Sequence, residues 1–187
     1  MKTVLQVDDD PNDVFLLRHA MTKVGVANPI QVASDGQQAI NYLQGSGRFA
    51  DREEFPFPCL VLMDLKLPYV MGLDVLRWIR QQPGMALTVL MLTASGSEAD
   101  IVEAYRLGAS GFLTKPSEAS KLEEMVKAIK DFWLTHNTLP QEPALEAPLE
   151  RVVWLAHPSL TGFAPKHRSH VNGVRRPKRS RYLKGSL

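Results

Sequence analysis

The sequence lacks several features that would assign it to common protein classes. Its 187 residues include one cysteine, Cys59, so the chain alone can form no disulfide, Cys-rich zinc site or iron–sulfur cluster. No segment approaches the ~18 apolar residues of a membrane-spanning helix. Acidic residues begin at position 8, before the apolar core of a signal peptide could develop. We therefore expect a cytoplasmic protein that makes no membrane contact.

A large excess of charge of one sign is also missing, but the charges are unevenly distributed. Residues 1–139 carry 13 Lys+Arg against 17 Asp+Glu, whereas residues 140–187 carry 9 against 3. Prolines 140, 143 and 148 disfavour regular structure where the balance changes. We predict one domain over residues 1–139, followed by a Pro-rich linker and a basic, disordered tail over residues 140–187. Such a tail is most often solvated charge, and contact with nucleic acid or an anionic surface stays open.

Short apolar runs alternate with helical patterns along the first 139 residues. The runs cover residues 4–7, 59–63, 89–92 and 112–113, and none of these four alternates polar with apolar residues; a weaker fifth candidate covers residues 30–32. Such runs are typical of strands that are buried on both faces. Apolar residues at helical spacing lie between them, and the clearest stripe is Leu122, Met125, Val126, Ile129 and Trp133. The order predicts an α/β fold, a doubly wound parallel sheet of five strands with helices on both faces.

Ligands of such sheets bind at the carboxyl ends of the strands, which makes the residues that follow each run the candidate site. Asp8 and Asp9 follow the first run, Asp64 the third, Thr93 the fourth and Lys115 the last. Neighbouring carboxylates repel one another unless a cation neutralises them, and Mg²⁺ prefers oxygen ligands. A metal, an ammonium and a hydroxyl around one carboxylate would hold a phosphoryl group, with Asp64 as the nucleophile.

The strings VDDDPND, VLMDLKLPYVMGLDVL, LTA and FLTKP, in this order and spacing, resemble the receiver domain of two-component response regulators. The resemblance covers about residues 2 to 135. It implies a flavodoxin-like sheet of order 2-1-3-4-5 and a protein that is not an enzyme but is activated when a histidine kinase phosphorylates it in the presence of Mg²⁺. The implied site residues are the phosphoacceptor Asp64; the metal ligands Asp8, Asp9, Asp64 and the backbone carbonyl of Lys66; the phosphate-binding Thr93 and Lys115; and the switch residues Thr93, Phe112 and Pro116, a proline that is usually cis in the family.

Three further segments resemble stand-alone regulators that partner bacterial phytochrome kinases. They are GSGRFADREEFPFP before the third strand, ASGSEADI after Thr93, and AIKDFWL at the end of the last helix. This group implies a sensor histidine kinase of the phytochrome type as partner, and it is compatible with a homodimer. Phe112 departs from the Tyr of many relatives, and residues after 140 match no output domain.

Alternative interpretations remain for single residues. The acidic run could cap a helix, Thr93 and Phe112 could be ordinary strand and core residues, and Cys59 could be a small buried residue. Phe132 and Trp133 could cover the core or meet a second copy of the chain.

Two other functions compete with the receiver interpretation. A haloacid-dehalogenase-type phosphatase also uses Asp, Mg²⁺ and Lys, but such enzymes resemble Asp-x-Asp where this chain has Asp64 and Lys66, and a cap domain is absent. In a DNA-binding regulator the tail would be the effector, yet it lacks the two helical patterns of a helix-turn-helix.

Overall fold

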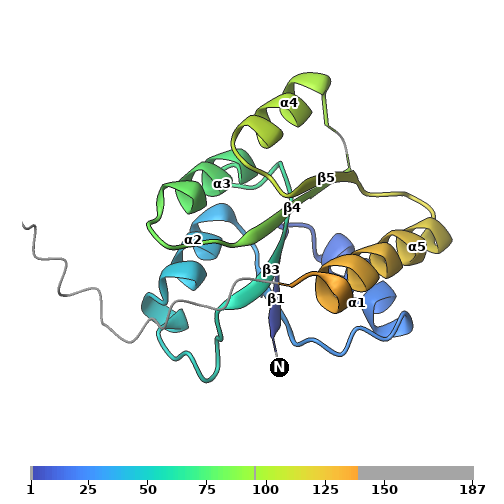
Figure 1. Cartoon of the computed structure of the whole chain (residues 1–187), viewed down its shortest axis with the longest axis horizontal. Helices are drawn as coiled ribbons and strands as arrows, with labels where there is room; N and C mark the ends of the chain where they lie inside the picture. Colours follow the sequence, from blue (N-terminus) through green and yellow to red (C-terminus); the bar gives the residue numbers. More distant parts are fainter. Residues whose placement is uncertain (1, 95, 139–187) are drawn as a thin grey trace, which may run out of the picture. The chain divides into compact units, whose positions relative to one another are not determined.

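The structure, a computed structural model, describes residues 2–94 and 96–138 and shows a five-stranded parallel sheet in the predicted order β2-β1-β3-β4-β5 (Figure 1). The strands are β1 (Thr3–Val7), β2 (Ile30–Ala33), β3 (Pro58–Met63), β4 (Thr88–Thr93) and β5 (Gly111–Thr114). The helices are α1 (Pro11–Lys23), α2 (Gly36–Gln44), α3 (Gly72–Gln81), α4 (Glu98–Arg106) and α5 (Ala119–Ile129), with the short segments η1 (Gly47–Phe49) and η2 (Lys130–His136). The predicted linker and tail, residues 140–187, lie outside the described residues, so the domain boundary stays a prediction.

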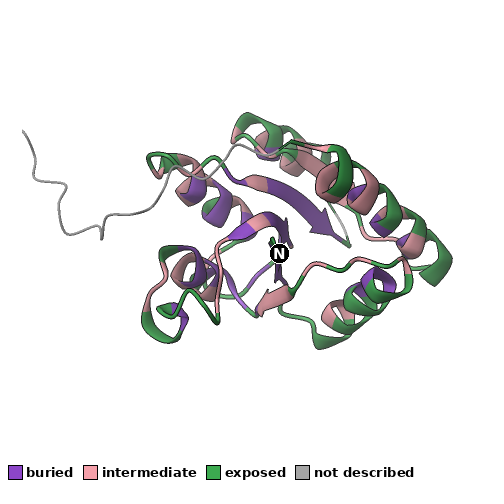
Figure 2. Ribbon diagram, turned by 60° about the horizontal axis from the view of Figure 1, so that its bottom comes forward, coloured by how far each residue is buried: buried purple, intermediate pink, exposed green. Residues whose placement is uncertain are grey.

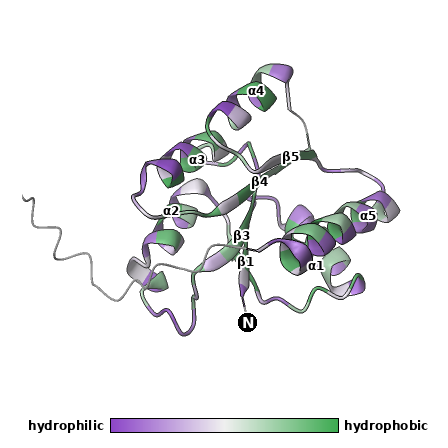
Figure 3. Cartoon of the chain, viewed as in Figure 1, coloured by the Kyte–Doolittle hydropathy of each residue, from purple (hydrophilic) through white to green (hydrophobic). Residues whose placement is uncertain are grey.

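The helices cover both faces of the sheet, because successive strand residues point to opposite faces. Leu5 and Val7 of β1 face the core shared with α2, α3 and α4, whereas Val4 faces the core shared with α1 and α5. Strand β3 is almost wholly buried, which explains its unbroken apolar run. Figure 2 shows buried residues along the sheet and exposed residues on the outer helix faces, and Figure 3 shows the matching division in hydropathy.

Local sequence signals set the helix ends. The Asp35 side chain accepts from the Gln38 backbone N–H at 2.6 Å and caps α2. Ser97 and Asp100 form a reciprocal capping box at the start of α4. Helix α3 ends at Gln81, shortly before Pro83, which disfavours the helical conformation of the residue before it.

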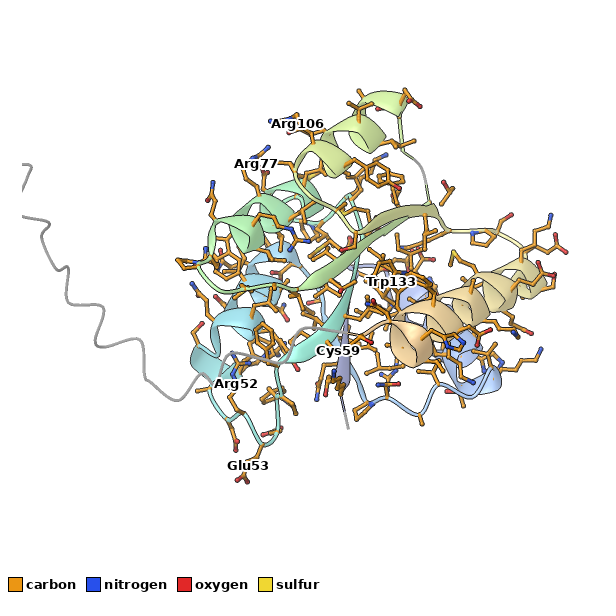
Figure 4. All side chains as sticks on the ribbon, in the orientation of Figure 1. Arg52, Glu53, Cys59, Arg77, Arg106 and Trp133 are labelled. Atoms are coloured by element: carbon orange, nitrogen blue, oxygen red, sulfur yellow. The ribbon has the colours of Figure 1, made fainter. Side chains whose placement is uncertain are left out.

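The segment between α2 and β3 contains its own aromatic cluster. The Tyr42 ring packs against Phe49 and Phe55, with ring centroids 5.3 and 6.2 Å apart, and the Tyr42 hydroxyl donates to the Pro56 carbonyl. Arg52, labelled in Figure 4, donates to the Tyr42 and Leu43 carbonyls at 2.8 Å each and so satisfies the C-terminal end of α2. The long segment is therefore anchored to the domain.

The two aromatic residues near the end of the described chain differ in burial. Trp133 packs against the core shared by α1 and α5, whereas the Phe132 side chain is 57% exposed. Core packing therefore explains Trp133, and contact with a second copy stays untested for Phe132. Cys59 is half-buried against the same core. Among the described residues, no helix has both the length and the apolar character needed to span a membrane.

Candidate phosphoryl-acceptor site

Backbone hydrogen bonds extend the sheet one residue beyond three strands and thereby fix the candidate site. The Asp8 N–H donates to the Ala33 carbonyl, and the Asp64 N–H donates to the Val7 carbonyl. The Lys115 N–H likewise donates to the Thr93 carbonyl at 2.8 Å. All of these bonds lie at the carboxyl edge of the sheet. The side chains therefore start from backbone positions that the sheet itself holds.

The Lys115 ammonium lies among carboxylates at this edge. Its Nζ is 2.7 Å from Asp8 Oδ2, 2.8 Å from Asp13 Oδ2 and 3.2 Å from Asp64 Oδ2. Asp8, Asp64 and Lys115 are largely buried, whereas the Asp13 side chain is 34% exposed. Three N–H donors thus meet three acceptors, which accounts for every hydrogen that an ammonium can donate.

A second grouping overlaps the first. Asp8, Asp9 and Asp64 each offer a carboxylate oxygen, and these oxygens lie within 4.8 Å of one another. Oxygen ligands of this kind suit Mg²⁺, which takes one or two carboxylates and retains waters. Asp9 is exposed and so leaves water access on one side. The donor set therefore fits a hard divalent cation.

Burial and charge perturb two groups of the site. Burial raises the pKa of the Asp8 carboxyl, and the hydrogen bond from Lys115 offsets part of that rise. Burial alone would lower the pKa of Lys115, but hydrogen bonds to Asp13 and Asp8 and the charge of Asp64 outweigh it, so the Lys115 pKa is raised. The ammonium therefore keeps its positive charge beside Asp64.

The loop from β3 to α3 folds back onto Asp64. The Leu65 N–H donates to Asp64 Oδ1 at 2.5 Å, and the Gly72 N–H donates to the Leu65 carbonyl at 3.0 Å. Gly72 packs so closely that a Cβ there would lie 2.0 Å from the Asp64 carbonyl oxygen. Lys66 lies exposed in this loop, and its backbone N–H approaches Asp64 Oδ1 at 3.4 Å. The glycine thus lets the loop close over the acceptor residue.

The remaining predicted residues lie along β4 and β5. Thr93 ends β4 and is buried, and Phe112 lies on β5, partly buried against the core under α2, α3 and α4. The Phe112 ring occupies space beside Gly96, where a Cβ would lie 2.6 Å from its Cζ atom. The described residues include no cis peptide bond, so Pro116 differs from the cis form that the resemblance implies. Because trans is the lower-energy isomer even before proline, Pro116 needs no special geometry here.

Sequence reasoning missed Asp13. Its position in the first turn of α1, three residues after the N-cap Asp10, was the available signal, since that turn begins beside the end of β1. The Asp10 side chain accepts from the Asn12 N–H at 2.8 Å, so helix capping correctly describes this one member of the acidic run. Asp8 and Asp9 instead face the site.

Comparison with known proteins agrees with this geometry. Residues 4–127 match the response regulator receiver domain family. Response regulator Rcp1 of Synechocystis sp. is 34% identical over 140 residues, which cover 74% of this chain and 93% of Rcp1.

Solved structures give the same relationship. The phosphorylated cyanobacterial phytochrome response regulator RcpA has a TM-score of 0.69 at 33% identity and covers 75% of this chain and 99% of its own. Response regulator RPA3017, from red light signalling of R. palustris, has a TM-score of 0.71 at 33% identity with the same coverage. The family model covers most of the described domain, and the acidic residues and the lysine lie together at the carboxyl ends of the strands. The chain therefore belongs to the response regulator receiver family.

Proposed function

We propose that Asp64 accepts a phosphoryl group from a phosphohistidine of a sensor histidine kinase, and that this reaction switches the domain in the cytoplasm. The observation that carries the proposal is the position of the Asp64 carboxylate. One of its oxygens lies 3.2 Å from the Lys115 ammonium, and its carboxylate also belongs to the group formed with Asp8 and Asp9. Phosphoryl transfer chiefly requires positioning and neutralisation of charge, which these groups supply.

The transfer step needs no reactant other than a solvent proton. An Asp64 carboxylate oxygen forms a bond to phosphorus while the phosphorus–nitrogen bond to the kinase imidazole breaks, and that imidazole keeps the bonding electron pair and takes a proton from the solvent. The Leu65 N–H orients the carboxylate through its bond to Oδ1. Lys115 donates toward the oxygens of the arriving group. The product is an acyl phosphate on Asp64.

Mg²⁺ would be held by Asp8, Asp9, Asp64 and the Lys66 carbonyl, and when bound it supplies positive charge to the phosphoryl oxygens. Asp8 and Asp9 would otherwise repel an incoming phosphate. That the similar regulator Rcp1 has an Mn²⁺-bound form supports the binding of a divalent metal by this chain. That RcpA has a phosphorylated form supports phosphorylation of this chain.

Thr93, Phe112 and Pro116 would carry the response. Thr93 lies on the strand beside Lys115, and its hydroxyl would be drawn toward a phosphoryl oxygen. The Phe112 ring packs against Gly96, in the loop that follows Thr93. A movement of Thr93 would therefore change the space that is open to this ring and alter the surface of α4 and β5.

The relatives also support a class of partner. RcpA is a cyanobacterial phytochrome response regulator, and RtBRR is a bacteriophytochrome response regulator. We infer that the kinase partner of this chain is of the phytochrome type. A homodimer in which the exposed Phe132 participates is part of the same proposal.

Labelling by acetyl phosphate with Mg²⁺ tests the proposal directly. Intact-mass spectrometry should show one added phosphoryl group on the wild type and none on Asp64→Asn, which keeps the shape of the side chain but removes the nucleophilic oxygen. Asp74→Asn is the matched control, because Asp74 is an exposed carboxylate on α3 that pairs with Arg77. Labelling of Asp64→Asn at the wild-type level would overturn the proposal.

A further inference from the structure

The Lys115 ammonium has one more partner than the phosphoryl chemistry requires. Among the described residues, the carboxylates that lie close enough to share a cation are those of Asp8, Asp9 and Asp64. Asp13 is outside this group. Asp13 nevertheless lies closer to Lys115 Nζ than Asp64 does, at 2.8 Å against 3.2 Å. It reaches the ammonium from the first turn of α1.

A phosphoryl oxygen on Asp64 needs an N–H of Lys115, and all three are already engaged. The incoming group must therefore draw the ammonium from a carboxylate. The Asp8 side chain is 3% exposed, so water cannot replace its lysine partner without a large desolvation cost. The Asp13 side chain is 34% exposed, so water can take the place of the ammonium. Of the two carboxylates that do not themselves accept the phosphoryl group, Asp13 is therefore the one whose bond to Lys115 yields more readily.

Resting on the proposed function, we propose that Asp13 is a positioning residue that competes with the phosphoryl group for Lys115. In the unphosphorylated domain its carboxylate draws the ammonium toward α1. The negative charge of Asp13 also repels the negatively charged phosphoryl group, because both would lie next to the Lys115 ammonium. Both effects act in one direction, so loss of the Asp13 charge should favour the phosphorylated geometry. Asp13 would thereby set how easily the site accepts and keeps a phosphoryl group.

Beryllofluoride, a mimic of the phosphoryl group on aspartate, tests this competition without turnover. Its affinity would be measured by fluorine NMR and calorimetry on the full chain at saturating Mg²⁺. Asp13→Asn should bind beryllofluoride roughly threefold to tenfold more tightly than the wild type, the range expected for one partly exposed charge-assisted bond. Asp13→Glu, which keeps the charge, should return most of the way to the wild-type affinity.

Asp10→Asn is the matched control. It removes the same charge from the same helix end, but the Asp10 side chain caps the Asn12 N–H, and asparagine caps equally well. We expect its beryllofluoride affinity to stay within about twofold of the wild type, because it removes only a screened, longer-range charge. Thermal shifts with Mg²⁺ alone should be similar for Asp10→Asn and Asp13→Asn.

The outcomes separate the two proposals. Equal affinities for Asp13→Asn and Asp10→Asn, or weaker binding by Asp13→Asn than by the wild type, would overturn the role of Asp13 while leaving Asp64 as the acceptor. Failure of the wild type to bind beryllofluoride, or equal binding by Asp64→Asn, would overturn the proposed function, and the role of Asp13 with it.

Discussion

The close approach of Gly72 to Asp64 makes the first prediction quantitative. A Cβ at position 72 would lie 2.0 Å from the Asp64 carbonyl oxygen, whereas real Cβ contacts stay beyond 3.0 Å. In Gly72→Ala the two backbone segments must therefore separate by at least about 1 Å. The Leu65 N–H that orients the Asp64 carboxylate is attached to the same peptide group as that oxygen. The displacement thus acts directly on the acceptor.

The expected effects follow from that distance. Overpacking of this kind costs about 1–3 kcal/mol of unfolding free energy, which for a chain of this size lowers the melting temperature by roughly 3 to 10 °C. A misplacement of about 1 Å can slow a positioned reaction by about 100-fold. The initial rate of phosphorylation by acetyl phosphate should therefore fall by up to that factor at a temperature where the variant is folded.

Two further glycines serve as comparisons. A Cβ at Gly111 would meet only the Leu90 Cδ2 atom, at 3.1 Å, and this flexible side chain can move. A Cβ at Gly36 would lie 2.0 Å from the Val70 carbonyl oxygen, in the same loop but farther along the chain from Asp64. We expect a near-normal rate for Gly111→Ala and an intermediate rate for Gly36→Ala. If circular dichroism shows that Gly72→Ala is folded and mass spectrometry shows a wild-type rate of phosphorylation, the contact between Gly72 and Asp64 does not position the acceptor.

Four other measurements test the stability of the domain, its metal site and the role of the tail. Burial raises the pKa of Tyr42 from 10.0 to about 12. The neutral phenol therefore stabilises the fold below pH 10, and this contribution is lost as the pH rises to about 12. An absorbance titration should show one tyrosine that ionises at higher pH than the others. Arg52→Ala removes the donor of the Leu43 carbonyl and one of the two donors of the Tyr42 carbonyl, which also accepts from the Gly45 N–H, and should cost about 1–3 kcal/mol in urea unfolding, whereas an unchanged midpoint would contradict that role. Mg²⁺ at 100 times its dissociation constant should stabilise the wild type by about 2.7 kcal/mol in thermal melts, and an equal shift in Asp9→Ala would count against the metal site. A chain that ends at Leu139 should fold and accept phosphate as the full chain does, at low and at high salt, and loss of either property would place the domain boundary elsewhere.

Much of the architecture could be predicted because its signals are local. Each buried strand appears as an unbroken apolar run, and alternation with helices is enough to predict a parallel sheet. The caps at Asp35 and Ser97 depend on residues three positions away, which the sequence shows directly. Even the gathering of Asp8, Asp64 and Lys115 follows from one rule about strand ends.

The parts that could not be predicted depend on distances between elements. Whether Trp133 or Phe132 faces the core depends on the rotation of the chain after α5, where the regular helix gives way to η2. The Phe112 ring occupies space beside Gly96 because the loop after β4 approaches β5, and no local pattern indicates that approach. The contact of Asp13 with Lys115 spans 102 positions and depends on the angle of α1 to the sheet.

The acidic run shows how one short segment serves several tasks when a strand changes into a helix within it. Asp8 still bonds to the β2 backbone as a strand residue, and its buried carboxylate faces Lys115. Asp10 caps the helix, and Asp13 returns to the site after the first turn, where the partial positive charge of the helix N-terminus favours an anion. The N-terminus of α1 and the ammonium of Lys115, which follows β5, thus hold together carboxylates that would otherwise repel one another. For this reason a change in either α1 or Lys115 should alter all of their interactions together.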